Sequence, residues 1–230
     1  MHVNPLEDSP LFAGLGTHAL NEIAGGLITE TWPRKRQIIG PSQTTQRFRI
    51  LTRGRVKITG SNSQEGRELT LWLLGPGDAF DIVSLLDGEP HAVSAWALDE
   101  VTILSAPMPL FRSWLERFPH LRLAMHRYAA GKLRELTELA TGIALHDTSA
   151  RLAHLLLRYI DTTHRSDKPC IDPMLDLPQE ELASMIGSVR VVVSRALADM
   201  ARQGVVSVHN GRLRIESLKR LLRFAGESSV

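Results

Sequence analysis

The hydrophobic pattern of the chain changes at Pro109, and this change limits the folds that are open to it. Between residues 30 and 107, short alternating apolar runs are separated by Gly and Pro, as at Gly54 and in Gly75–Asp78. A period of two with such turn residues is typical of strands in a barrel or sandwich. After Pro109 the apolar residues recur every three or four positions, which is helical spacing. The sequence therefore predicts an α+β chain whose first half, after a short helix at about residues 17–27, is β-rich.

Composition places the chain among ordinary globular proteins. Of its 230 residues, 43% are hydrophobic and 23% are charged, which suffices to bury a core and fits two modest domains. We find neither an uncharged apolar run of about 18 residues nor an N-terminal signal segment, so we expect no membrane association. Cys170 is the single cysteine, which excludes an internal disulfide and a cysteine-based metal framework. We therefore expect a cytoplasmic protein.

A long amphipathic helix is predicted over residues 119–145. It presents one apolar stripe, which packs either on its own domain or on a second copy of itself. The near-heptad spacing favours the second copy, so we expect a dimerisation helix. The stripe consists of Met125, Ala129, Leu133, Leu136, Ala140 and Ile143. Asp147 then caps a further predicted helix at residues 149–162. The predicted organisation is a sensor domain at 1–118, the helix at 119–145 and a third domain at 146–230.

The segment from Gln179 to Gln203 predicts two short helices joined by a turn at Gly187. Small and apolar residues fall where two such helices must bury against each other, which is helix-turn-helix spacing. These residues are Leu182, Ala183, Ile186, Val193 and Ala196. Two strand-like runs with Asn210-Gly211 between them follow, and Asn-Gly is a strong hairpin signal. A helix-turn-helix followed by a hairpin is a winged helix.

Basic residues concentrate in two parts of the chain. Between Ser188 and Phe224, eight basic residues face two acidic ones, a local net charge of +6. A second run, from Arg34 to Lys57, contains eight basic residues and no acidic one. Either run alone fits a solvated face, but the coincidence of the first with a winged helix favours a phosphate backbone as its partner.

The chain resembles the Crp/Fnr family of bacterial transcription regulators along nearly its whole length. The resemblance rests on Ser9–Ala24, Leu73–Pro90 and Leu177–Val206, which occur in the family's order. It implies a β-roll (jelly-roll type) like that of cyclic-nucleotide-binding domains, a dimerisation helix and a winged helix. It also implies a homodimer on pseudo-palindromic double-stranded DNA, with RNA polymerase as a further partner.

The resemblance assigns DNA contacts to residues of the winged helix. Base readout falls to Arg190, Val191, Ser194 and Arg195. Contacts to the DNA backbone fall to Gln179, Ser188, Arg212 and Arg214. Arg195 can make a bidentate contact to guanine, whereas Val191, where many relatives carry Glu, can pack only on a thymine methyl. Val193 is expected in the core.

The sensor half departs from members of the family that bind cyclic AMP. Their Gly-Glu pair reads Asp81-Ile82 here, and no register of residues 91–94 supplies the arginine of their phosphate site. We therefore expect no cyclic AMP binding, since an anionic ligand would lose its charge-assisted partner. The candidate effector pocket comprises Asp81, Ile82, Val83, Ser84, His91, Ala92, Val93 and Ser94.

The cysteine and histidine content of the chain bears on which other cofactors it could hold. A lone cysteine excludes an iron–sulfur cluster held by four cysteines. Haem stays open as a gas-sensing alternative, because histidines are available at His18, His91, His120 and His126. An apolar or anionic metabolite in the β-roll, or activity without any effector, is also open.

These features predict a dimeric, sequence-specific transcription regulator and not an enzyme. No paired carboxylates, metal-ligand spacing, nucleophile elbow or phosphate loop is evident. The alternatives are a haem-based gas sensor of the same fold and a ligand-responsive regulatory subunit that does not bind DNA. The second gives no role to the basic winged helix.

Overall fold

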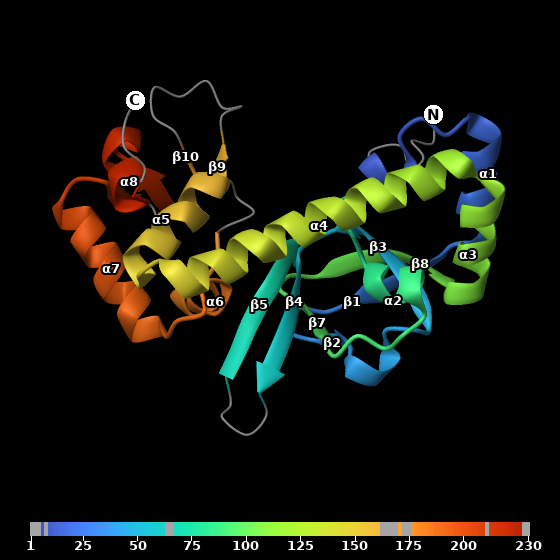
Figure 1. Ribbon diagram of the computed structural model, residues 1–230, viewed down its shortest axis with the longest axis horizontal. Coiled ribbons are helices and arrows are strands. Elements are labelled where there is room, and N and C mark those ends of the chain that lie inside the picture. Colours follow the sequence, from blue (N-terminus) through green and yellow to red (C-terminus); the bar gives the residue numbers. More distant parts are fainter. Residues whose placement is uncertain are drawn as a thin grey trace. The chain divides into compact units, whose positions relative to one another are not determined.

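The computed structural model describes residue 6 and residues 9–62, 67–161, 170–171, 176–209 and 212–226. The chain divides into two compact units within helix α4 (Pro119–Leu145), after Leu136. Figure 1 shows α4 as one continuous helix, as its sequence pattern predicts. The units divide inside α4 because the first part of the helix packs on the β-rich unit, and the domain bounds of 118 and 146 stay a prediction. None of the helices in the described ranges is long and apolar enough to cross a membrane.

The first unit contains two four-stranded sheets, with strand orders β1-β8-β3-β6 and β2-β7-β4-β5. Their strands are β1 Ile28–Trp32, β2 Gln37–Ile39, β3 Arg47–Arg53, β4 Val56–Asn62, β5 Arg67–Leu74, β6 Ala79–Phe80, β7 Ser94–Ala97 and β8 Val101–Pro107. The predicted β-roll is therefore confirmed. At the β3–β4 turn, Gly54 has a φ of 84°, and a Cβ there would lie 2.5 Å from the Glu100 carbonyl oxygen, so only glycine fits.

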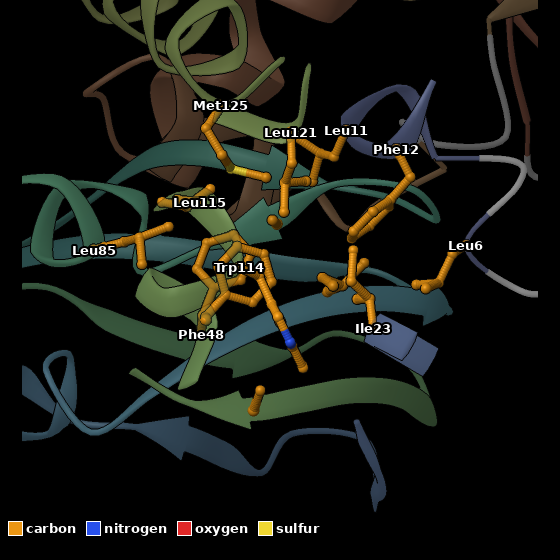
Figure 2. Close-up of a cluster of buried hydrophobic side chains, with 14 of the residues drawn as sticks. Leu6, Leu11, Phe12, Ile23, Phe48, Leu85, Trp114, Leu115, Leu121 and Met125 are labelled. Atoms are coloured by element: carbon orange, nitrogen blue, oxygen red, sulfur yellow. The ribbon is translucent and has the colours of Figure 1, made fainter. Parts of the chain in front are cut away.

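Helices cover one end of this unit and complete its core. They are α1 (Thr17–Gly26), α2 (Ile82–Asp87), α3 (Met108–Arg117) and the start of α4, with a short 3-10 helix at Pro10–Phe12. The sequence pattern predicts α1 but misses α2 and α3. Phe48 of β3 lies in this core (Figure 2), and its ring centroid is 4.2 Å from that of Phe111 on α3.

The residues of the apolar stripe that is predicted to form the dimer interface fall into two groups. One group is packed against the β-rich unit and the other is exposed. Met125 is 0% exposed and lies in the core cluster beside Leu121 (Figure 2), so its assignment to a subunit interface is wrong. Ala129 and Leu136 are partly buried against the same unit. The other three residues of the stripe are exposed: Leu133, Ala140 and Ile143. The error arises because a stripe on a helix does not reveal which neighbour covers it.

The second unit is a winged helix. Its elements are α5 Thr148–Arg158, β9 Ile160–Asp161, β10 Cys170–Ile171, α6 Gln179–Met185, α7 Arg190–Arg202, β11 Val206–His209, β12 Arg212–Ile215 and α8 Leu218–Phe224. The sheet order is β11-β12-β10-β9. Asp147 caps α5 as predicted, accepting a hydrogen bond from the Ala150 amide at 2.8 Å. Helix α5 ends at Arg158, earlier than the predicted end at residue 162, because Ile160 and Asp161 pair with β10. The predicted loop at 164–168 and the Asn210-Gly211 turn lie outside the described residues.

Candidate functional site

The two helices of the helix-turn-helix pack as the sequence predicts. Leu182, Ile186, Val193 and Ala196 are each at most 5% exposed. Gly187 has a φ of 60°, in the left-handed region that glycine adopts most readily, and it turns the chain between α6 and α7. The Ser188 amide then donates to the Ala183 carbonyl at 2.9 Å, which fixes the end of α6. The start of α7 is thereby held by backbone geometry and a buried contact surface.

One face of α7 is left open to solvent. Arg190, Val191, Ser194 and Arg195 are all exposed, and Val191 is 59% exposed while Val193 is 0% exposed. Residues three and four apart are neighbours on a helix, so these four side chains form a continuous face over its first two turns. Arg190 and Arg195 have no hydrogen-bond or ion-pair partner among the described residues. The face therefore offers two free guanidinium groups beside a methyl-bearing side chain.

The residues predicted to contact the DNA backbone belong to α6, the turn before α7 and β12. Gln179 is the first residue of α6 and Ser188 lies in the turn before α7, and both are half-buried. Arg214 on β12 is exposed, as the wing requires. Arg212 is also on β12, but its side chain is outside the described residues.

A small cavity lies in the β-roll where the resemblance places the effector. Its volume is about 20 Å³, room for roughly one water molecule. Five of the eight predicted residues line it: Asp81, Ile82, Val83, His91 and Val93. Ser84, Ala92 and Ser94 do not line it. Six further residues complete the wall and are not indicated by the sequence: Ile58, Trp72, Leu74, Ala79, Phe80 and Lys132.

A buried ion pair connects Asp81 in the cavity wall to Arg49, which does not itself line the cavity. Arg49 of β3 donates from Nη1 to Asp81 Oδ2 at 2.8 Å, and the two side chains are only 6% and 1% exposed. Burial raises the pKa of the Asp81 carboxyl to about 7, and the Arg49 guanidinium opposes that rise. The Arg49 guanidinium also lies 6.0 Å from the centre of the Phe80 ring. No sequence pattern indicates this pair, because its members are 32 residues apart and Arg49 stands in a run of cations.

Helix α4 contributes a cation, Lys132, to the cavity wall. The Lys132 ammonium contacts Asp78 at 3.5 Å and Glu135 at 3.1 Å, and it lies over the Tyr128 ring. The Tyr128 hydroxyl accepts from the Ala79 amide and hydrogen-bonds Asp78 Oδ1, both at 3.0 Å. Burial and the nearby Asp78 carboxylate raise the pKa of that hydroxyl. This network fastens α4 to the turn before β6.

His91 completes the polar lining. Its backbone amide donates to Thr44 Oγ1 at 2.9 Å, and its ring meets Trp72 edge-on with centroids 6.4 Å apart. Burial lowers the pKa of the His91 imidazole, against the opposing effect of Asp87. The imidazole is therefore mostly neutral at pH 7.

The cavity residues do not fit a cyclic nucleotide. A ribose hydroxyl would meet the Ile82 side chain in place of a carboxylate, and the phosphate would meet Asp81, whose carboxylate repels it when ionised. No arginine is among the described residues that line this cavity, and the Nη1 of Arg49 is already bound to Asp81. The space is also too small for a nucleotide, since ligand pockets typically span about 300–1,000 Å³.

Four of the eight basic residues in the second basic run of the sequence form ion pairs within the β-roll. Arg47, Arg49, Arg53 and Arg55 pair with Glu30, Asp81, Glu100 and Asp99 respectively. The Arg55 guanidinium lowers the pKa of the Asp99 carboxyl by hydrogen-bonding it. This run therefore serves the β-roll itself, unlike the open arginines of α7.

Both halves of the chain match known domain families. Residues 29–118 match the cyclic nucleotide-binding domain, and residues 150–224 match the Crp-like helix-turn-helix domain. The matched ranges coincide with the β-roll and the winged helix described above.

Individual relatives align along most of the chain. A CRP-like cAMP-activated global transcriptional regulator of Mycobacterium tuberculosis is 29% identical over 215 residues, which cover 94% of this chain and 96% of that protein. A global nitrogen regulator of Nostoc sp. is 29% identical over 82% of this chain and 85% of its own length. A solved structure of a CooA variant from Carboxydothermus hydrogenoformans covers 96% of this chain and 97% of that chain, with a TM-score of 0.79 and 23% identity. The last is a likeness of fold.

Proposed function

Because this chain belongs to the Crp/Fnr family of transcription regulators, we propose that it binds pseudo-palindromic DNA sites as a homodimer and reads bases with α7. The observation that carries the proposal is the exposed face of Arg190, Val191, Ser194 and Arg195. A recognition helix of this kind enters the major groove with its N-terminal residues against the base edges. At a promoter, RNA polymerase is the second macromolecular partner that we propose.

The position of Arg190 supports a role in binding over one in stability. Arg190 is the first residue of α7, where the helix macrodipole disfavours a cation. The stability of the fold does not explain an unpaired guanidinium at this position, whereas a contact to a DNA phosphate or to a guanine does. A ligand-responsive subunit that does not bind DNA leaves this arrangement without a role.

The second element of the proposal is a dimer seam on the exposed face of α4. Exposed residues alternate at spacings of three and four along this face, which is the heptad repeat of a two-stranded coiled coil. The seam consists of Leu123, His126, Ala130, Leu133, Thr137, Ala140 and Ala144. This seam replaces the stripe through Met125 and leaves Leu121, Met125 and Tyr128 to their own β-roll.

The third element is that cyclic AMP is not the effector. Support comes from Ile82 and Asp81 at the positions of the nucleotide-binding pair and from the volume of about 20 Å³. The surroundings of His91 do not favour the haem alternative, since its ring stands against Trp72 in a space of about one water molecule.

Arg195→Ala should weaken specific binding by about 1–3 kcal/mol and relax discrimination at one position of each half-site, because a bidentate guanine contact is lost. Val191→Glu should shift the preference at its position towards a cytosine-bearing base pair. Selection of sites from a random DNA pool with each variant measures both effects. Ala198→Ser, on an exposed position further along α7, is the matched control and should select the parental motif. If Arg195→Ala selects that motif with unchanged stringency, α7 is not the reading helix.

Arg214→Ala in the wing should weaken all DNA sequences alike and lower the slope of log affinity against log salt by about one. The reason is that a backbone contact releases one counterion without reading a base. Titrations of one specific and one random duplex across a range of salt concentrations measure the slope. Lys219→Ala, which removes an exposed charge from α8, tests whether any lost cation has the same effect. A loss confined to the specific duplex would contradict the assignment of Arg214.

A further inference from the structure

We propose that the β-roll carries an anion site that the chain fills by itself: Arg49 is the cation of this site and Asp81 is its resident anion. The inference rests on the proposed function in treating this cavity as the place of the effector. It adds that an anionic ligand must displace Asp81 to bind, so Asp81 sets the charge selectivity of the cavity.

The geometry of Arg49 is that of an occupied anion site. Its Nη1 donates to Asp81 Oδ2 at 2.8 Å and to the Arg47 carbonyl at 3.1 Å. Its Nε is buried and has no hydrogen-bond partner among the described residues. A guanidinium presents its donors in a fixed fork that matches the oxygens of a carboxylate or of a tetrahedral anion. Asp81 accepts a hydrogen bond from Nη1 of the guanidinium and leaves the Nε donor unsatisfied.

The backbone conformation of Asp81 indicates that its side chain occupies space that a glycine would leave open. Asp81 has a φ of 68°, in the left-handed region that glycine adopts most readily. It stands where the resemblance places the Gly of the nucleotide-binding pair. The chain therefore keeps a glycine-like backbone there but carries a carboxylate, which turns inward to Arg49 and fills space that glycine would leave open.

The charged and titratable groups around Asp81 determine when its carboxylate can be released from Arg49. Arg49 of β3 contacts Asp81 directly, whereas Lys132 of α4 and His91 of the segment before β7 line the same cavity. Since burial raises the pKa of Asp81 to about 7, proton uptake just below neutral pH removes its charge and frees the Arg49 guanidinium. The site should then accept an external anion, such as sulfate, that does not titrate in this range.

The test compares sulfate with chloride at equal ionic strength, read as the shift in melting temperature of the full chain. At about pH 8.5, Asp81→Asn should gain a sulfate-dependent rise in melting temperature, with an apparent affinity at least about tenfold tighter than the parent's. Arg49→Gln/Asp81→Asn should lose the gain, because the cation is gone. Asp81→Gly is a second variant, and both Asn and Gly tolerate a left-handed backbone.

The parent protein provides a further test of the inference that needs no substitution. Its response to sulfate should appear as the pH falls from about 8.5 to about 6, through the pKa of Asp81, and should be absent from Arg49→Gln/Asp81→Asn, which retains His91 and Lys132. A sulfate response in the double variant, or none in Asp81→Asn, Asp81→Gly and the acidified parent, would overturn the inference. DNA binding is measured separately, so a parent that binds sulfate as expected but no DNA would contradict only the proposed function.

Discussion

Leu133→Glu is expected to convert the protein to a monomer and to reduce its affinity for a palindromic site by roughly a hundredfold or more, because both half-sites must be engaged for full affinity. Leu133 is 65% exposed and lies at the middle of the proposed seam on α4. In a two-fold symmetric pair each introduced carboxylate would meet the same surface of the partner, so an apolar contact becomes a like-charge repulsion. Light scattering gives the mass, and titration of a full site and a half-site gives the two affinities.

Leu86→Glu is the matched control for this prediction. Leu86 is an exposed leucine of α2, 44% exposed, and lies outside the seam. This variant should keep both the dimer and the parental affinity. A Leu133→Glu protein that remains dimeric would show that the subunits associate through another surface.

Arg49→Leu is expected to lower the free energy of unfolding by about 3–5 kcal/mol, because it leaves the Asp81 carboxylate buried without its partner. Arg49→Leu/Asp81→Leu should recover most of this loss, since replacing both members of a buried pair by apolar residues is often neutral. Urea denaturation followed by circular dichroism measures the difference between the two variants.

The pH dependence of this loss has a definite sign. Arg49 opposes the rise in the Asp81 pKa, so its removal raises that pKa beyond about 7. At about pH 8.5 the folded Arg49→Leu protein must either bury the charged Asp81 carboxylate or bind a proton that is scarce at this pH, and both cost free energy. Near pH 6 the Asp81 carboxyl is already neutral, so this cost is absent. The destabilisation should therefore be larger at pH 8.5. Equal stabilities of the single and double variants at that pH would contradict a structural role for the ion pair.

Local patterns predicted the elements of this fold well. The Asn-Gly hairpin signal, the cap at Asp147 and the turn at Gly54 each depend on a few neighbouring residues, and β12, α5 and β3–β4 lie as expected. Helices α2 and α3 were missed because both are short and follow turn residues, so their apolar spacing spans too few turns to stand out.

The winged helix was also the easier site to predict. Neighbouring residues of one helix point in different directions, so helical spacing assigns Val193 to the core, whereas the exposed position of Val191 was expected from the family resemblance. The cavity was harder to predict, because Ile58, Trp72 and Lys132 line it from three separate elements. No periodicity relates such residues, and the search for a cation near residues 91–94 could not find one that comes from a different strand or helix.

Helix α4 places two consecutive residues in different roles. Lys132 lines the cavity of the β-roll, and Leu133, turned by about 100° around the helix axis, lies in the proposed seam. A rotation of α4 that accommodates a new occupant beside Lys132 must also change how Leu133 faces a second subunit. In evolutionary terms, a lineage with this architecture can acquire a new signal through substitutions around Lys132 while α7 keeps its DNA sequence, so that the stimulus and the set of target genes diverge independently.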